Sequence, residues 1–321
     1  MEKTVIEKIQ GFERFGSVLG LERMQVLMEL LGNPQDTLRC LHVAGTNGKG
    51  SVCRFLYEGL RANGYKVGLF TSPFIEVFNE RIEFDGAHIS DADLASCTET
   101  VLAQVDVMLA RGCDSPTEFE VVTAIAFLYF KEKGADFVVL EVGLGGRGDS
   151  TNIIKKPLLS IITSISYDHT DRLGKTLAEI AGEKAGIIKA GVPVVMNVKT
   201  EGREAEKVIA RKAYEIGSVL HDVTKLRCGN ERTDMDGTTF DASIYGTSYA
   251  DVDISMLGSH QVQNALTALT ALELLRKECI IKVRRDILYA GIKNARMIGR
   301  FELMRWTEGE YGEKKPPNVI L

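Results

Sequence analysis

The fold is decided by residues 41–51, which read Leu-His-Val-Ala-Gly-Thr-Asn-Gly-Lys-Gly-Ser. An apolar strand runs directly into a glycine-rich turn that carries Lys49, and a helix is expected behind the turn. Such a turn exposes backbone N–H groups, the lysine adds a charge, and the helix N-terminus adds a partial positive charge, so together they can bind the phosphates of a nucleotide. A tight strand-to-helix connection without a ligand is the alternative interpretation.

One position departs from the usual spacing of a phosphate-binding loop. A hydroxyl residue normally follows the lysine and holds Mg²⁺, whereas this chain has Gly50 there. The hydroxyl must therefore come from Ser51, one position further on, or from another loop.

Strands and helices alternate along the chain, which predicts the α/β class with a mostly parallel sheet flanked by helices. The strands are expected at 39–43, 66–71, 136–141, 158–165 and 193–198. The helices are expected at 50–63, 91–110, 118–133, 176–189, 262–277 and 283–295. Residues 218–256 are polar and rich in β-forming residues, which indicates a small antiparallel excursion rather than a new domain.

Composition restricts the classes of partner. The chain has 321 residues, 26% charged residues and a net charge of −5, which argues against a protein that binds nucleic acid or an anionic membrane. Its six cysteines show no metal-ligand spacing, as expected of buried thiols in a reducing compartment. No apolar run is long enough to span a bilayer, so we expect a cytoplasmic protein.

Three residues near predicted strand ends are candidates for chemistry. Glu141 closes an apolar strand, and His169 follows the next one, so both are expected at the carboxyl edge of the sheet, where ligands bind. Glu141 is a candidate Mg²⁺ ligand, or else a helix-capping or ion-paired carboxylate. His169 is a candidate ligand or a structural histidine. Lys184 lies on the apolar face of the predicted 176–189 helix, where spacing alone favours a lysine that extends its ammonium group to water.

Together the motifs resemble the folylpolyglutamate synthase and dihydrofolate synthase family of the Mur ligase superfamily. The resemblance covers nearly the whole chain, from residue 19 to residue 302. Only 40 residues precede the phosphate loop motif, which leaves no room for the UDP-binding domain of peptidoglycan Mur ligases and favours the folate branch. The segments that carry the resemblance are VAGTNGKGS (43–51), TSPF (71–74), NERI (79–82), EVGLGGRGDSTN (141–152), DHTDRLGKT (168–176), IAGEKAGIIK (180–189) and SHQVQNA (259–265).

The resemblance implies a role for each matching position. It implies two Mg²⁺ ions held by Ser72, Glu141 and His169, and a Lys184 carbamylated by CO₂ that faces the metal. Phosphate binding is assigned to Thr46, Asn47, Gly48, Lys49, Gly50 and Ser51, with further ATP contacts from Asn264 and Arg300. The folate-type substrate is assigned to Thr117, Glu118, Phe119, Glu120, Gly148, Asp149 and Ser150, together with the 14–23 region.

The chain departs from the family most strongly at its end. Family members continue after a run like Val319-Ile320-Leu321 into a whole C-terminal domain, which helps to enclose ATP and supplies much of the glutamate site. We therefore expect a P-loop Mur ligase-like ATP-binding domain over residues 1–297. Residues 298–321 are expected to form a linker and the first strand of a C-terminal ligase domain that is cut short.

The activity implied by the resemblance is an ATP-dependent amide ligation. It adds L-glutamate to a folate-type carboxylate, tetrahydrofolate or dihydropteroate, through an acyl phosphate. The alternatives are a module that binds ATP and folate without ligating them, and a different amide ligase of the same superfamily. Relatives imply a monomer that acts on small molecules. The sequence leaves open which folate-type acceptor is used and how long a glutamate chain is made.

Overall fold

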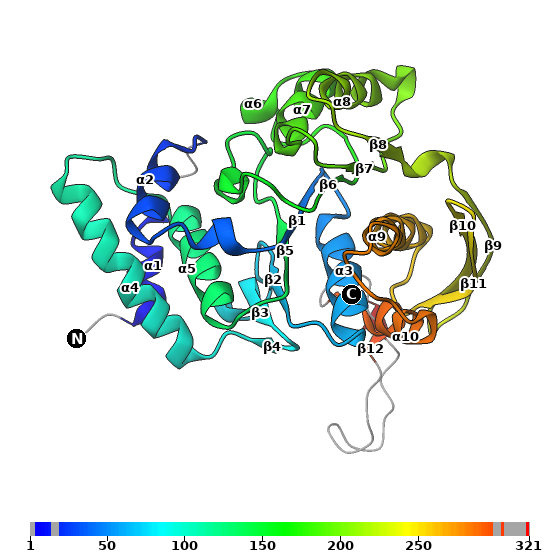
Figure 1. Cartoon of the computed structure of the whole chain (residues 1–321), viewed down its shortest axis with the longest axis horizontal. Coiled ribbons are helices and arrows are strands. Elements are labelled where there is room, and N and C mark those ends of the chain that lie inside the picture. Colours follow the sequence, from blue (N-terminus) through cyan, green and yellow to red (C-terminus); the bar gives the residue numbers. More distant parts are fainter. Residues whose placement is uncertain (1–3, 14–18, 298–302, 305–318, 321) are drawn as a thin grey trace, which may run out of the picture.

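The computed structural model describes residues 4–13 and 19–297, together with the strand pairing of 303–304 and 319–320. Its main sheet has eight strands in the order β4-β3-β2-β5-β1-β6-β7-β8 (Figure 1). From β2 to β8 the strands are parallel, and the β3–β4 hairpin adds two antiparallel strands at one edge. The strands are β1 Cys40–Ala44, β2 Val67–Phe70, β3 Ile82–Phe84, β4 Ala87–His88, β5 Phe137–Glu141, β6 Leu159–Ile162, β7 Val194–Met196 and β8 Leu220–Asp222.

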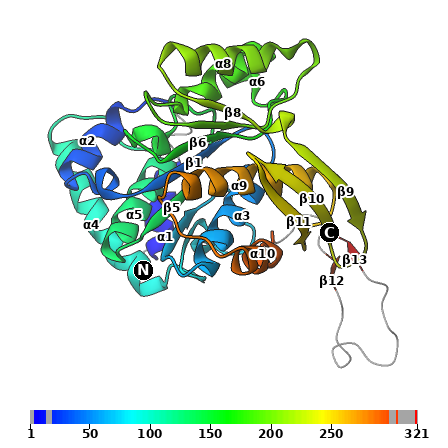
Figure 2. The same ribbon diagram turned by 45° about the vertical axis from the view of Figure 1, so that its right-hand side comes forward.

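Helices cover both faces of this sheet, and the views in Figures 1 and 2 place them in separate groups. One group packs on the face that Cys40, Val138 and Leu140 present: α1 Val5–Gln10, α2 Glu22–Leu30, α4 Asp91–Ala110 and α5 Glu118–Glu132. The opposite face receives α3 Lys49–Ala62, α9 Ser259–Lys277 and α10 Arg285–Asn294. A third group lies beside β6 and β7: α6 Thr170–Leu173, α7 Leu177–Lys184 and α8 Glu204–Glu215.

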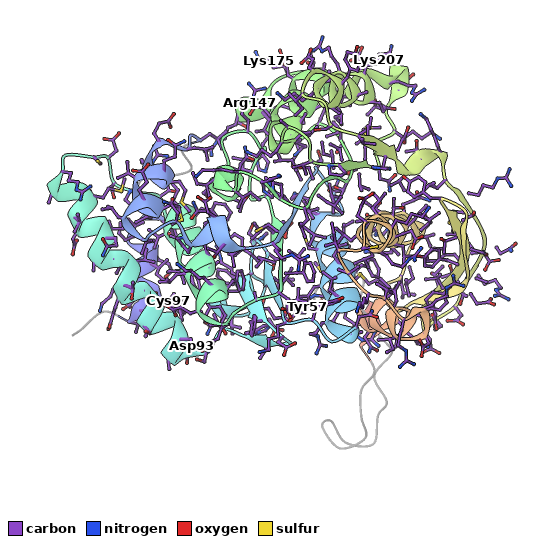
Figure 3. All side chains as sticks on the ribbon, in the orientation of Figure 1. Tyr57, Asp93, Cys97, Arg147, Lys175 and Lys207 are labelled. Atoms are coloured by element: carbon purple, nitrogen blue, oxygen red, sulfur yellow. The ribbon has the colours of Figure 1, made fainter. Side chains whose placement is uncertain are left out.

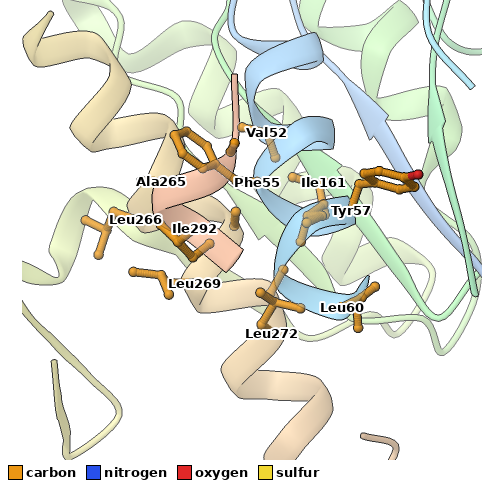
Figure 4. Packing of buried hydrophobic residues seen from close by; sticks show 14 of the residues in the cluster. Val52, Phe55, Tyr57, Leu60, Ile161, Ala265, Leu266, Leu269, Leu272 and Ile292 are labelled. Carbon is orange, nitrogen blue, oxygen red and sulfur yellow. The ribbon is translucent and has the colours of Figure 1, made fainter. Parts of the chain in front are cut away.

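The alternation of side chains along the strands explains this arrangement. In β1, Leu41 and Val43 join the core beneath α3, whereas Cys40 joins the core beneath α5. Successive strand residues point to opposite faces, so a strand that is apolar throughout must be covered on both sides. Figure 4 shows the α3 side of this core, where Val52 and Phe55 pack against α9 and α10.

A small antiparallel sheet covers the outer side of α9 and α10. It is formed by β9 Arg227–Thr233, β10 Thr238–Ile244 and β11 Thr247–Ile254, in the order β11-β10-β9. The expected excursion over 218–256 is thus confirmed from β9 onward, but its first part was assigned wrongly. Leu220–Asp222 pairs in parallel with β7 as the edge strand of the main sheet, because its extended backbone finds hydrogen-bond partners there.

Other boundaries differ from the expectations in specific ways. The strand expected over 158–165 ends at Ile162. The Thr163 N–H still donates to Ala44 O at the end of β1, but the Thr163 hydroxyl and the residues after it bind the phosphate loop. The helix expected over 176–189 changes at Ala185 into a short 3-10 turn. The strand expected after residue 298 falls mostly outside the described residues, where only β12 Leu303–Met304 pairs with β13 Val319–Ile320. No helix in the described part of the chain is long and apolar enough to cross a membrane.

Candidate functional site

The glycine-rich turn connects β1 to α3 as the sequence predicts. Gly48 is the residue before the helix and has φ +83°, a left-handed conformation that glycine adopts without steric penalty. Gly45 has φ +156°, and a Cβ at this position would lie 1.8 Å from Thr163 Oγ1. Both glycines are therefore required by the backbone path. The turn places the first N–H groups of α3 at the carboxyl edge of the sheet, where an anion can accept hydrogen bonds from them.

A second loop, residues 163–166 after β6, holds the turn in place. The Thr46 N–H donates to Ser164 O at 2.7 Å, and the Ser166 N–H donates to Thr46 Oγ1 at 3.1 Å. The Asn47 N–H donates to Ser164 Oγ at 3.0 Å, and Thr163 Oγ1 donates to Asn47 O at 2.7 Å. The Thr46 side chain and the Asn47 backbone are thus committed to shaping the loop. Sequence reasoning missed the 163–166 loop, although its three hydroxyl residues directly after a buried strand were an available signal.

Two lysines converge on a single carbonyl group of the turn. Lys49 Nζ donates to Gly45 O at 3.1 Å and to Thr46 O at 3.2 Å. Lys184 Nζ donates to the same Gly45 oxygen at 2.8 Å. Lys184 is only 3% exposed, and burial, together with the nearby charge of Lys49, lowers its pKa from 10.5 to about 8. Spacing alone favoured an ammonium group that reaches water; the α7 face instead directs it inward to the phosphate loop.

The candidate metal ligands are brought to the same edge to different degrees. Glu141 ends β5 beside β1 and is 6% exposed. The Ser72 N–H donates to its carboxylate at 3.3 Å. A Cβ at Gly50 would lie 3.0 Å from Met297 Cε and 3.6 Å from Glu141 Oε2, so the glycine lets both groups lie close to the start of α3. His169 also follows the carboxyl edge, but its side chain is 55% exposed and lies 3.6 Å from the Asp168 carboxylate.

The donor chemistry of this edge suits Mg²⁺, which prefers oxygen ligands. Glu141 supplies a carboxylate, and Ser72 supplies a hydroxyl from the loop after β2. Within the described residues no three His, Cys, Asp or Glu side chains gather as a ready cation site. The phosphate oxygens of a nucleotide would therefore have to complete the coordination sphere, which is common for Mg²⁺.

The two further ATP candidates have different outcomes. Asn264 lies in the first turns of α9, and a Cβ at Gly48 would lie 2.4 Å from its Oδ1 atom. Asn264 thus contacts the phosphate loop, and its Nδ2 donates to Gln261 Oε1 at 3.0 Å. Arg300 lies outside the described residues, as do residues 14–18 of the expected 14–23 pocket segment.

A cavity of about 420 Å³, hereafter the first cavity, brings together the candidate substrate residues. It lies between the N-terminus of α5 and the glycine-rich loop after β5. Ser72 and Pro73 also line it. The candidate residues that line it are Thr117, Glu118, Phe119, Glu120, Gly148, Asp149 and Ser150.

Several of these side chains have structural partners of their own. Thr117 and Glu120 form the reciprocal capping box that begins α5. Glu120 also pairs with Arg23 through two contacts of 3.0 and 3.1 Å. Asp149 is fully buried, and burial raises the pKa of its carboxyl group. Because its oxygens accept bonds from the Leu144 N–H and from Thr151, Asp149 shapes the loop rather than presenting a free carboxylate to a ligand.

Arg81 is a charged group of the first cavity that sequence reasoning missed. Its guanidinium lies 3.5 Å from Glu118 and over the rings of Phe74 and Phe78. Burial lowers the pKa of Arg81 and raises the pKa of Glu118, whose carboxylate also faces Glu13. The motif NERI contains Arg81, but nothing in its spacing identifies the partner carboxylate 37 positions away.

A second cavity of about 580 Å³ adjoins the first and shares Ser72 and Pro73 with it. It is lined by Gly50 and Glu141 from the phosphate-loop side and by charged residues such as Arg54 and Glu83 from the other side. Ser72 and Pro73 therefore separate the candidate substrate cavity from the space next to the phosphate loop.

Comparison with known proteins agrees with this geometry. Residues 43–272 match the Mur ligase middle domain family. The chain is 44% identical over 315 residues to the dihydrofolate synthase/folylpolyglutamate synthase of Bacillus subtilis, covering 95% of this chain and 72% of that protein. The chain belongs to the Mur ligase family, in its folylpolyglutamate and dihydrofolate synthase branch.

Other members of the branch extend the comparison. The folylpolyglutamate synthase of Lacticaseibacillus casei is 36% identical over 282 residues, which cover 84% of this chain and 63% of that one. A solved FPGS complex with AMPPCP superposes with a TM-score of 0.89 at 32% identity, over 98% of this chain and 74% of the other. The Thermotoga maritima folylpolyglutamate synthase superposes with a TM-score of 0.85 at 36% identity, over 94% of this chain and 68% of the other. The chain thus spans about two thirds to three quarters of the length of these family members.

Proposed function

We propose that this chain is the ATP-binding part of a ligase that joins L-glutamate to the carboxylate of a folate-type acceptor. The observation that carries the proposal is the shared wall between the two cavities. Ser72 lines the first cavity, and its N–H contacts the carboxylate of Glu141 beside the phosphate loop. A carboxylate held in the first cavity would therefore face the terminal phosphate of a nucleotide held by the loop. One related structure is a complex with AMPPCP, and another is a complex with both AMPPCP and folate. These two complexes support the pairing of a nucleotide with a folate-type ligand.

The reaction follows from the chemistry of a carboxylate. It is a poor acyl donor, because hydroxide would have to leave. Transfer of the γ-phosphoryl group of ATP to the carboxylate oxygen gives an acyl phosphate and ADP. The amine of glutamate then attacks the acyl carbon, the amide forms, and phosphate leaves with the C–O bonding pair. No side-chain nucleophile is required, so catalysis consists of positioning and charge stabilisation.

The residues of the site divide these tasks. The N–H groups of the phosphate loop and Lys49 would bind and neutralise the phosphates. Ser72, Glu141 and His169 would hold Mg²⁺, two ions in our proposal, and bound Mg²⁺ would supply charge stabilisation for phosphoryl transfer. Asn264, adjacent to Gly48, would contact the nucleotide.

Lys184 is proposed to react with CO₂ and become a carbamate. Its lowered pKa supports this, because only the neutral amine can attack CO₂ and a pKa of about 8 leaves about a tenth of the lysine neutral at pH 7. The modification would replace a buried cation by an anion that faces the metal.

The proposed acceptors are dihydropteroate and tetrahydrofolate, with glutamate as the amine donor. We further propose that the protein acts as a monomer on small molecules, without nucleic acid or membrane. A cytoplasmic setting is supported by the absence of disulfides among its six cysteines, all of which lie in the described part of the chain.

A mass-spectrometric ligation assay tests the proposal. The purified chain is incubated with ATP, Mg²⁺, bicarbonate and glutamate, and offered dihydropteroate and tetrahydrofolate separately. A product heavier by one glutamyl residue, absent in a Lys49→Ala variant, is expected. If ADP were released only when another class of amine replaces glutamate as the acyl acceptor, the chain would be a different amide ligase. Nucleotide binding without glutamate-dependent ADP release would show that this chain binds but does not ligate.

The carbamate is tested by chemical rescue. A Lys184→Ala variant should have little activity and should recover part of it when acetate supplies a short carboxylate. Full activity of the variant without acetate would show that no carbamate is needed.

A further inference from the structure

A buried chain of hydrogen bonds joins the central strand to the wall of the first cavity. His42 lies in β1 and is fully buried, and its Nε2 atom is 2.8 Å from Thr151 Oγ1. Thr151 Oγ1 is in turn 2.5 Å from Asp149 Oδ1, which also accepts from the Thr151 N–H at 3.0 Å. The other carboxylate oxygen, Asp149 Oδ2, accepts from the Leu144 N–H at 2.8 Å. The three side chains thus connect the sheet core to the loop over residues 143–150.

The direction of each bond follows from counting protons. The Thr151 hydroxyl donates its single proton to Asp149 Oδ1. The hydroxyl oxygen must then accept from His42, which fixes a proton on Nε2. The opposite ring atom, Nδ1, is buried and has no hydrogen-bond partner in the described structure. A buried nitrogen without a proton costs less free energy there than a buried N–H without an acceptor. The bond to Thr151 and the surroundings of Nδ1 therefore both require the neutral tautomer with its proton on Nε2.

The surroundings of His42 keep it neutral. Burial and the charge of Lys189 lower its pKa to about 3. Lys189 itself donates to Asn152 O at 3.1 Å, and Asn152 directly follows Thr151 in the sequence. The neutral ring can then donate from Nε2 to the Thr151 hydroxyl.

The loop that this chain anchors forms one wall of the first cavity. Gly143, Leu144 and Gly148 line the cavity. A Cβ at Gly143 would lie 2.5 Å from the Phe119 ring, so loop and ring are in close contact. On its outer side the loop rests on α7, where the Arg147 N–H donates to Glu183 O at 2.9 Å (Figure 3). A small shift of this loop would change the width of the cavity at Phe119.

We propose that His42, Thr151 and Asp149 form a positioning relay that sets the shape of the first cavity. His42 is thus a positioning residue for the folate-side substrate, and this assignment rests on the proposed function of that cavity. His42 belongs to β1, the strand that leads into the phosphate loop. Its side chain nevertheless lies on the α5 face of the sheet, because the side chains of neighbouring strand residues point to opposite faces.

Two variants of Thr151 distinguish the effect of its hydroxyl group from the effect of its side-chain volume. Thr151→Val keeps the volume and removes the hydroxyl, whereas Thr151→Ser keeps the hydroxyl. For Thr151→Val the Kd of dihydropteroate should rise about 10- to 100-fold, as expected when a buried carboxylate loses a donor. The Kd of AMPPCP should change less than about twofold, and Thr151→Ser should stay within about threefold of wild type for both ligands. In turnover the KM for the acceptor should rise while kcat stays nearly constant.

A second readout does not depend on any ligand. The Leu144 N–H is held by Asp149, so hydrogen exchange of the 143–149 segment should be faster in Thr151→Val than in Thr151→Ser. If wild type binds no dihydropteroate, the proposed function fails, and the exchange result alone decides the relay. His42→Gln, which can donate from a similar position, and His42→Leu, which cannot, repeat the comparison should Thr151→Val fail to fold. Equal behaviour of the donor and non-donor variants, or equal losses for both ligands, would overturn the proposal.

Discussion

Replacing Lys184 with methionine should make the protein more stable and abolish its proposed activity. The charged form of Lys184 is disfavoured in the folded chain, since its pKa is about 8 instead of 10.5. At about 1.4 kcal/mol per pKa unit, this destabilises the folded state by about 3 kcal/mol below pH 8. Methionine has a similar unbranched side chain and no charge. It loses the 2.8 Å bond to Gly45 O, worth about 1 kcal/mol, but that oxygen keeps Lys49 as a partner.

The net expectation is a gain of about 1–2 kcal/mol in the free energy of unfolding at pH 7. It is measured by urea denaturation in buffers purged of CO₂, so that the lysine stays unmodified. The wild-type protein recovers stability as pH rises from 8 to 10.5, because the folded chain has then lost this proton while the unfolded chain still binds it. At pH 9.5 less than half of the electrostatic penalty should remain, and the advantage of the variant should shrink accordingly.

Lys207→Met is the matched control, because Lys207 is exposed on the outer side of α8 (Figure 3). Its stability should stay within about 0.5 kcal/mol of wild type. A Lys184→Met variant that is less stable than wild type at pH 7 would refute the reasoning. It would show that the bond to Gly45 outweighs the burial of the charge. The expected result would show that the site retains Lys184 for its chemistry although the residue lowers the stability of the folded protein.

Three further changes probe other parts of the molecule. Glu273→Gln should lower the free energy of unfolding by about 3 kcal/mol at pH 7, because hydrogen bonds lower the Glu273 pKa from 4.5 to about 2. That contribution is present above pH 4.5 and is lost as pH falls towards 2. The difference in the free energy of unfolding between wild type and variant, measured with urea, should therefore shrink by about 2 kcal/mol at pH 3. A difference that stays constant with pH would contradict this prediction. Gly45→Ala should weaken AMPPCP binding at least about tenfold in calorimetry, since its Cβ would overlap Thr163. Gly182→Ala, where a Cβ has open space, should bind as wild type does. Glu141→Ala should lower kcat about 100- to 1000-fold, and near-normal turnover would remove it from the metal site.

The parts of the site that the sequence predicted are those carried by short contiguous motifs. Residues 45–51 form a turn whose glycines, lysine and flanking strand are adjacent in the chain, so their geometry follows from local backbone preferences. Glu141 was placed correctly at the carboxyl edge because an apolar run that ends in a carboxylate has few alternatives in a parallel sheet. The 117–120 and 148–150 segments came only from the family resemblance, and the structure brings them to one cavity.

What the sequence left out depends on contacts between distant segments. Ser164 and Ser166 bind the phosphate loop across more than a hundred residues, and no periodicity records such a pairing. Leu220–Asp222 looked polar enough for the small sheet, because an edge strand need not be buried on both faces. Asp149 lines the first cavity, and no sequence pattern records that its carboxylate also accepts from the Leu144 and Thr151 N–H groups.

The two lysines on the Gly45 carbonyl change what nucleotide binding means for this loop. In this structure the ammonium groups of both lysines donate to the protein's own carbonyl oxygens. A phosphate that enters must compete for Lys49, so binding exchanges one set of partners for another and adds few new ones. Nucleotide affinity should accordingly depend as much on how readily the loop releases its lysine as on how well the phosphate is held.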